Sequence, residues 1–189
     1  MPTAVFGYGS VVWKFPYPHS KQWAPVCVRG YERVFYQGST DHRGTPEAPG
    51  RTVTLVPQEG GVVWGACFLI DGPEEAAVLA EMEVREKQYD VRERLAVYDA
   101  SGQCVVESAL CYIGTPECDN WLGPPEGGVD ELAQQIAVAV GPSGPNDEYL
   151  FNLAHAMREY GVQDDSLFEL ERKVKEVQAA LRDTAGAAS

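Results

Sequence analysis

The amino-acid sequence predicts an α+β fold: a small, twisted, mixed β-barrel or sheet packed against helices, with a helical C-terminal third. Short runs rich in β-branched and aromatic residues fill most of the first two-thirds of the 189 residues, and turn residues separate them, as in strands. Helical periodicity is concentrated after residue 128. Because strands and helices do not alternate regularly, the pattern argues against a doubly wound parallel sheet.

The strands are predicted at residues 4–8, 26–37, 51–56, 62–70, 91–98 and 104–113. The glycine at position 30 predicts a bulge or bend in the second strand. The segments PQEGG and DASGQ have the composition of hairpin turns. They predict one hairpin between the third and fourth strands and another between the fifth and sixth.

Four helices are predicted. The first starts at Pro73, because proline is favoured in a first helical turn and two glutamates follow it. After a loop at 114–128 that contains three prolines, further helices are expected at 130–140, 146–160 and 165–182, with Asn146 as an N-cap. The last carries apolar residues at three- and four-residue intervals, which predicts a packing seam; they are Leu167, Leu170, Val174, Val177 and Leu181.

Size and composition predict one domain over residues 1–183 and a disordered tail at 184–189. The net charge of −13 argues against nucleic acid or an anionic membrane as a partner, since both attract clustered lysine and arginine. The five cysteines show no CxxC pair and no metal-binding spacing, so we expect reduced core thiols and no metal site. No signal peptide or membrane-spanning run is evident, which predicts a cytoplasmic protein.

The segment VFGYGSVVW, near the start of the chain, does not fit a nucleotide-binding loop. The third glycine of the dinucleotide fingerprint would fall at Val12, Pro16 follows closely, and no Gly-Lys-Ser/Thr is present. What remains is a strand that ends in a turn. The backbone N–H groups of Gly9, Ser10 and Val11 then form a nest for a carboxylate or phosphate, or the segment is a plain tight turn whose glycines permit positive φ.

Glu86 is a candidate acid/base. It follows Met82 by four residues and Leu79 by seven, so it lies on the apolar side of the first helix, near its C-terminus. Desolvation and the helix dipole both raise the pKa of such a carboxyl group towards neutrality, as general acid/base catalysis requires. The alternative is a structural ion pair with Arg85.

Other polar residues give weaker evidence of a catalytic or binding role. His42 beside Asp41 suggests catalysis, but no nucleophile elbow accompanies them, and the polar segment 39–47 is equally typical of a loop scaffold. Tyr149 follows closely after the predicted cap at Asn146, where its hydroxyl either reaches a neighbouring site or packs.

Six segments, in order along the chain, resemble the ChaC-type glutathione-specific γ-glutamylcyclotransferases, and the similarity extends from residue 5 to about 180. They are FGYGSVVWKFPYP, YERVFYQGSTDHRGTPEAPGRTVTLV, VWGACFLI, VREKQYD, CYIGTPECDNWLGP and GPSGPNDEYLFNL. The resemblance implies a twisted β-barrel with packed helices. It also implies cleavage of glutathione to 5-oxoproline and Cys-Gly without a metal or organic cofactor.

The resemblance further implies that Tyr8, Gly9, Ser10 and Val11 hold the α-carboxylate of the γ-glutamyl group through backbone N–H groups. It assigns the acid/base role to Glu86 and places Tyr149 near the substrate. Val11 stands where leucine is usual, and VREKQYD and GPPEGGVDEL depart from the common patterns, which affects the outer pocket. Other γ-glutamyl amino acids or amines as substrates, and a non-catalytic anion-binding module, are the alternatives. Glu83 is the next candidate for the acid/base.

Overall fold

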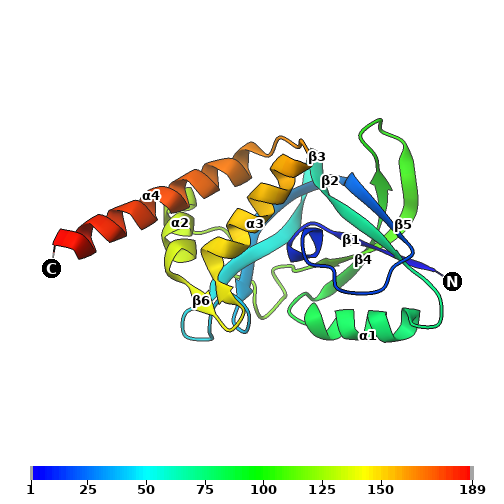
Figure 1. The fold of residues 1–189 in the computed structure, drawn as a ribbon, viewed down its shortest axis with the longest axis horizontal. Coiled ribbons are helices and arrows are strands. Elements are labelled where there is room, and N and C mark those ends of the chain that lie inside the picture. The colour runs from blue at the N-terminus through cyan, green and yellow to red at the C-terminus, as the bar shows by residue number, and fades with distance from the viewer. Residues whose placement is uncertain (1, 188–189) are drawn as a thin grey trace.

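The main strands close into a barrel in the order β1-β3-β2-β4-β5 in the computed structural model, which describes residues 2–187 (Figure 1). The barrel strands are β1 (Thr3–Gly7), β2 (Lys21–Ser39), β3 (Gly50–Ile70), β4 (Val91–Tyr98) and β5 (Cys104–Ile113). A two-stranded sheet pairs β6 (Val140–Gly141) with β7 (Gly144–Pro145). The helices are α1 (Glu75–Arg85), α2 (Gly128–Val138), α3 (Asn146–Glu159) and α4 (Asp165–Ala187), with a 3₁₀ turn, η1, at Ser10–Val12.

The barrel is mixed, as predicted. β1 pairs antiparallel with β3 and parallel with β5, and the remaining barrel pairs are antiparallel. The predicted hairpin across DASGQ is confirmed as β4–β5, where the Asp99 carboxylate accepts hydrogen bonds from the N–H groups of Ser101 and Gln103. β1 therefore occupies the seam of the barrel, and the chain leaves it directly into η1.

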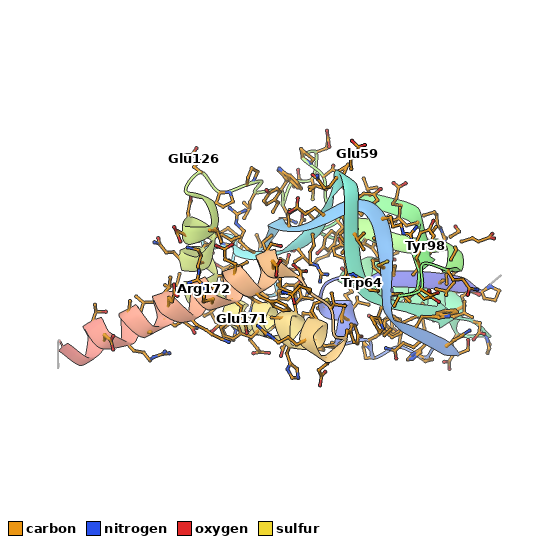
Figure 2. The ribbon with its side chains drawn as sticks, turned by 90° about the horizontal axis from the view of Figure 1, so that it is seen from above. Glu59, Trp64, Tyr98, Glu126, Glu171 and Arg172 are labelled. Atoms are coloured by element: carbon orange, nitrogen blue, oxygen red, sulfur yellow. The ribbon has the colours of Figure 1, made fainter. Side chains whose placement is uncertain are left out.

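The predicted hairpin across PQEGG is wrong, because β3 is one long strand. Both of its halves run antiparallel to β2, and the register changes between Arg29↔Val62 and Tyr31↔Pro57. Residues 58–61 thus face only Gly30 and bulge outwards, with Glu59 at the outer end (Figure 2). Gly30 and Gly60 have φ of 84° and 72°, conformations that allow this bulge.

Three helices share a core with one end of the barrel, and α1 packs elsewhere (Figure 1). α2, α3 and α4 bury Ile136, Leu153 and Leu170 in the main core. α1 places Val78 and Met82 against the outside of the barrel in a separate cluster. The two sets of helices leave between them the ends of β1 and β3, where the candidate site lies.

The helix boundaries correct two expectations. α4 continues to Ala187, so residues 184–187 of the predicted disordered tail are helical, and the Thr184 hydroxyl donates within the helix to Ala180 O and Leu181 O; residues 188–189 lie outside the described part of the chain. Asn146 is not the N-cap of α3, since Pro145 takes that place and Asn146 is fully buried.

The packing seam of α4 is confirmed for its first part. Leu167, Leu170 and Val174 are buried, but Leu181 is 48% exposed because α4 extends past the rest of the domain (Figure 1). Among the helices within residues 2–187, none is long and apolar enough to cross a membrane.

All five cysteines are free. Cys27, Cys67 and Cys111 are buried, as expected of core thiols, whereas Cys118 is partly exposed and Cys104 is exposed. Burial raises the pKa of Cys67 to about 12 and raises that of Cys27 and Cys111 as well.

Candidate active site

A cleft of about 480 Å³ opens where β1 ends, between the C-terminus of α1 and the loop that joins β2 to β3. Its lining contains the residues that the sequence nominated: Tyr8, Gly9, Ser10, Val11, Glu86 and Tyr149. It also contains Arg85, Tyr89 and Tyr112, and residues of the β2–β3 loop. The fold thus brings the glycine segment, the glutamate and the tyrosine together.

Residues 8–11 form what we call the anion loop, and its N–H groups are available to a ligand. Gly9 is the N-cap of η1, and its carbonyl accepts the Val12 N–H at 3.0 Å. Within residues 2–187, the N–H groups of Gly9, Ser10 and Val11 donate to no protein acceptor. Consecutive free N–H groups at the start of a helical turn attract an anion.

Gly7 and Gly9 are required because neighbouring side chains approach their Cα atoms closely, and not because they adopt positive φ. Neither Gly7 nor Gly9 has positive φ, so the plain-turn explanation does not account for them. A β-carbon on Gly7 would lie 2.3 Å from Val11 Cγ1, and one on Gly9 would lie 2.6 Å from the Tyr149 hydroxyl. The missing side chains let the loop fold back on itself and touch α3.

Tyr8 anchors the anion loop to the barrel. Its side chain is buried, and its hydroxyl donates to Tyr112 O at 2.6 Å. The buried Arg33 guanidinium donates to Tyr8 O at 3.0 Å. Burial raises the pKa of the Tyr8 hydroxyl, which stays protonated as a donor.

Glu86 lies where α1 ends. It is the C-cap residue, and its N–H donates to Met82 O at 2.8 Å. Its side chain is 13% exposed and lines the cleft, and Arg85 Nε lies 3.1 Å from Oε1. Burial raises the pKa of Glu86, while the charges of Arg85 and Arg92 oppose the rise. The desolvated carboxyl group and the ion pair, which the sequence offered as alternatives, are therefore present together.

Glu83 has a different environment. Its carboxylate accepts hydrogen bonds from Arg92 Nη2 at 2.6 Å and from the Tyr112 hydroxyl at 3.0 Å. The Arg92 hydrogen bond is the largest of the effects that lower the pKa of Glu83. Glu83 is about half exposed and lies outside the lining of the cleft. These contacts favour Glu86 over Glu83 as the acid/base.

Two tyrosine hydroxyls meet at Val53 beside Glu86. The Tyr149 hydroxyl accepts the Val53 N–H at 3.5 Å, and the Tyr89 hydroxyl donates to Val53 O at 2.8 Å. Burial, together with the Glu86 charge, raises the pKa of both hydroxyls, so both remain protonated donors. Tyr89 was not nominated from the sequence. The signal for it is its place three residues after Glu86, in a turn closed by Tyr89 N–H and Glu86 O at 3.0 Å.

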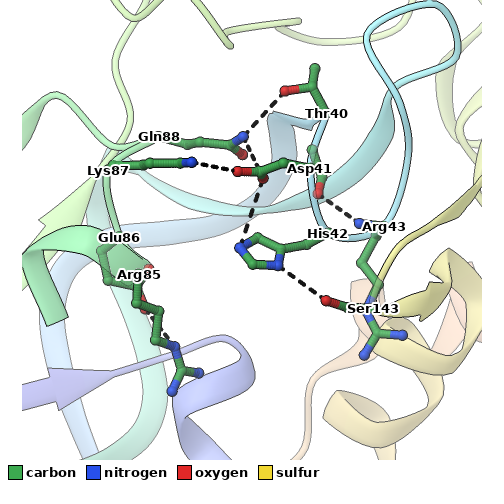
Figure 3. Close-up of polar contacts among 10 residues, drawn as sticks. Thr40, Asp41, His42, Arg43, Arg85, Glu86, Lys87, Gln88 and Ser143 are labelled. Atoms are coloured by element: carbon green, nitrogen blue, oxygen red, sulfur yellow. Dashed lines mark hydrogen bonds and ion pairs between the residues drawn. The ribbon is translucent and has the colours of Figure 1, made fainter. Parts of the chain in front are cut away.

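The second wall of the cleft is the polar loop that the sequence left without a role. Asp41 is held by Gln88 Nε2 at 2.6 Å and by Lys87 Nζ at 2.9 Å (Figure 3). His42 lies between them and Ser143, with Nε2 3.7 Å from Asp41 Oδ1 and Nδ1 3.1 Å from Ser143 Oγ. The segment directly after Glu86 therefore fastens this loop across the cleft.

Within residues 2–187, no three His, Cys, Asp or Glu side chains are grouped so that they could hold a metal ion. The cleft lining contains backbone N–H groups, the carboxyl groups of Asp41 and Glu86, arginine side chains and tyrosine hydroxyls.

Comparison with known proteins identifies the family. A family model described as ChaC-like protein matches residues 3–177. Gamma-glutamylcyclotransferase 2-3 of Arabidopsis thaliana is 45% identical over 148 residues, which are 75% of this chain and 73% of that protein. Glutathione-specific gamma-glutamylcyclotransferase 1 of Homo sapiens is 39% identical over 146 residues, 75% of this chain and 64% of that protein. The crystal structure of a γ-glutamylcyclotransferase specific to glutathione from yeast matches with a TM-score of 0.86 and 28% identity, over 94% of this chain and 97% of that one. On this evidence the chain belongs to the ChaC-like protein family.

Proposed function

We propose that this chain is a γ-glutamylcyclotransferase that cleaves glutathione to 5-oxoproline and Cys-Gly. One observation carries the proposal: free N–H groups for a carboxylate and a desolvated glutamate line the same cleft. The names of the human and yeast relatives, which specify glutathione, support the choice of substrate.

The reaction needs no nucleophile from the protein. The α-amino nitrogen of the substrate attacks its own γ-carbonyl carbon, a new C–N bond closes the five-membered ring, and the bond to the cysteine nitrogen breaks. The anion loop holds the α-carboxylate, so that the γ-glutamyl group folds back on itself. Because both reacting groups belong to one molecule, correct orientation contributes up to about 7–11 kcal/mol.

Glu86 moves the proton. As a carboxylate it takes one proton from the α-ammonium group, and as a carboxylic acid it gives that proton to the cysteine nitrogen as the amide bond breaks. The ring nitrogen then loses its second proton to the Glu86 carboxylate, which passes it to the free amine of Cys-Gly, and this product leaves as an ammonium ion. The protein ends each cycle in its starting state. Burial suits this double role, since it brings the pKa of Glu86 nearer to neutrality.

Tyr149 is the better placed of the two tyrosines to stabilise the developing oxyanion. Its oxygen accepts the Val53 N–H, which leaves its own proton to donate, whereas the Tyr89 proton is already used on Val53 O. Both line the cleft with Glu86.

The experiment that tests the proposal is mass-spectrometric detection of 5-oxoproline after incubation with glutathione, with γ-Glu-Ala in a parallel reaction. We expect 5-oxoproline and Cys-Gly from glutathione and much less product from γ-Glu-Ala. Faster turnover of γ-Glu-Ala would replace glutathione by another γ-glutamyl substrate. Thermal stabilisation by glutathione without any product would instead indicate a binding module.

A further inference from the structure

One arginine contacts both halves of the cleft. Arg85 Nη2 donates to Ser10 Oγ at 2.9 Å, and Nη1 donates to Lys14 O at 3.0 Å. Its Nε lies 3.1 Å from Glu86 Oε1. All three nitrogens of the guanidinium are thus engaged, on two segments that are more than 70 residues apart in the chain.

The contact between Arg85 and Glu86 depends on where the helix ends. Neighbouring side chains of a regular α-helix point away from each other and do not meet. α1 ends at Arg85, and Glu86 has φ −97° and ψ 20°, outside the helical conformation. At this break in the helix, the Glu86 carboxylate and the Arg85 guanidinium are in contact.

We infer that Arg85 is a positioning residue that couples the anion loop to the acid/base, fixing the Ser10 hydroxyl and one oxygen of Glu86 with a single guanidinium. This inference rests on the proposed function and deepens it. Within residues 2–187, Arg85 is the cation that bonds Glu86, and it does so at Oε1, which leaves Oε2 for the substrate ammonium.

The same guanidinium prepares the anion loop. Because Ser10 Oγ accepts a hydrogen bond from Arg85, the Ser10 hydroxyl proton is available for a bound carboxylate. Arg85 also supplies the local positive charge that an anionic substrate needs on a protein of net charge −13. Lysine does not replace this geometry, since an ammonium group is a point charge without the planar fork.

The positive charge of Arg85 and the burial of Glu86 have opposite effects on the pKa of Glu86. Burial favours the neutral acid, and the charge of Glu86 contributes to the raised pKa of Tyr89, Tyr112, Tyr149 and Cys111. Arg85 and the more distant Arg92 oppose the effect of burial and favour the carboxylate. Removal of Arg85 therefore raises the pKa of Glu86, and the acidic limb of the kcat/KM profile moves to higher pH.

The test compares Arg85→Gln and Arg85→Lys with Arg172→Gln, which breaks an exposed arginine–glutamate pair on α4. For Arg85→Gln we expect kcat/KM for glutathione to fall by about 100-fold and its acidic limb to move to higher pH, with partial recovery on addition of guanidinium ion. Arg85→Lys should recover only part of the activity, and Arg172→Gln should match the unaltered chain. Full activity in Arg85→Lys, or a loss in Arg85→Gln that follows only its thermal stability, would overturn the inference.

A second measurement separates this inference from the proposed function. The Glu86 carboxyl carbon, labelled with ¹³C and assigned by its loss in Glu86→Gln, is titrated by NMR in the unaltered chain and in Arg85→Gln. We expect the midpoint at higher pH in Arg85→Gln, and an unchanged midpoint contradicts the role of Arg85. If this shift appears but the unaltered chain forms no 5-oxoproline, the proposed function fails and the coupling of Arg85 to Glu86 stands.

Discussion

Gly9 and Tyr149 are in such close contact that a β-carbon on Gly9 would lie 2.6 Å from the Tyr149 hydroxyl oxygen. The contact joins the anion loop to α3, which comes from the other end of the chain. A β-carbon on Gly9 would also lie 2.9 Å from Val53 Cγ2, so any side chain at position 9 must move either the loop or both of these neighbours.

We expect Gly9→Ala to lower the free energy of unfolding by about 1–3 kcal/mol through overpacking, and to lower kcat/KM further through the displaced N–H groups. Tyr149→Phe removes the hydroxyl, so Gly9→Ala should be less destabilising in that background. Chemical denaturation of the single and double variants measures this coupling. Gly186→Ala is the control, because a β-carbon there meets no atom within 4 Å; equal effects of Gly9→Ala in both backgrounds would contradict the contact.

Glu86→Gln should lose turnover while it keeps the fold and binds glutathione. General acid/base groups contribute about 100- to 10,000-fold, so kcat for 5-oxoproline release should fall within that range. Glu83→Gln is the matched control, since Glu83 is paired with Arg92 outside the cleft. Near-normal turnover in Glu86→Gln would remove Glu86 from the mechanism, and an equal loss in Glu83→Gln would show that the loss is not specific to Glu86.

The same substitution should affect stability in a pH-dependent way. The pKa of Glu86 is raised in the folded chain, so the folded state binds this proton more tightly than the unfolded state does. The ionised carboxylate therefore destabilises the fold at pH values above its ordinary pKa. Thermal unfolding should show Glu86→Gln gaining stability relative to the unaltered chain as the pH rises from acidic to neutral. A difference that does not vary with pH would mean that burial does not raise this pKa.

Asp41 should control substrate affinity more than the chemical step. The Asp41 carboxylate accepts a hydrogen bond from Gln88 and lies close to Lys87 Nζ and His42 Nε2. These contacts fasten the β2–β3 loop across the cleft. We expect Asp41→Ala to raise KM for glutathione roughly 10-fold, or about 1.4 kcal/mol, with a smaller change in kcat. Steady-state kinetics beside the exposed Asp119→Ala would show whether the effect belongs to this loop.

Asn146 should matter for stability even though it caps no helix. It is fully buried, its Nδ2 donates to Arg51 O at 2.8 Å, and its Oδ1 accepts the Arg51 N–H at 2.7 Å. Asn146→Ala leaves both backbone groups unpaired, and we expect a loss of at least about 2 kcal/mol in the free energy of unfolding. Asn152→Ala, partly exposed on the same helix, should change it by much less. Urea denaturation of the two variants compares them directly.

Local patterns in the sequence were sufficient for most of the fold. The barrel strands, the β4–β5 hairpin and the four helices follow from residue preferences and turn residues that act over a few positions. PQEGG was misinterpreted because a hairpin and a bulged strand have the same local composition. The difference lies in β2, which extends from Lys21 to Ser39 and pairs with both halves of β3.

The candidate site likewise combines local sequence features with contacts between residues that are far apart in the chain. Local features, namely the spacing from Met82 and the glycine pattern, nominated Glu86 and the anion loop, and the structure places both in one cleft. Their roles in the reaction stay predictions. The roles of Asp41 and Arg85 could not be predicted, since each depends on a partner far along the chain. Asp41 meets Gln88 across 47 residues, and Arg85 meets Ser10 across 75. Only folding brings such pairs together.

The buried thiols of the barrel have a consequence for the conditions under which this chain can work. Thiol–disulfide exchange requires a thiolate that the reagent can reach. Cys27, Cys67 and Cys111 are buried, and their raised pKa keeps them protonated. A catalyst that consumes glutathione changes the redox balance of its own solution, and a core built in this way does not form mixed disulfides as that balance shifts. The thiols of the barrel core therefore stay unmodified when the proposed reaction lowers the concentration of glutathione.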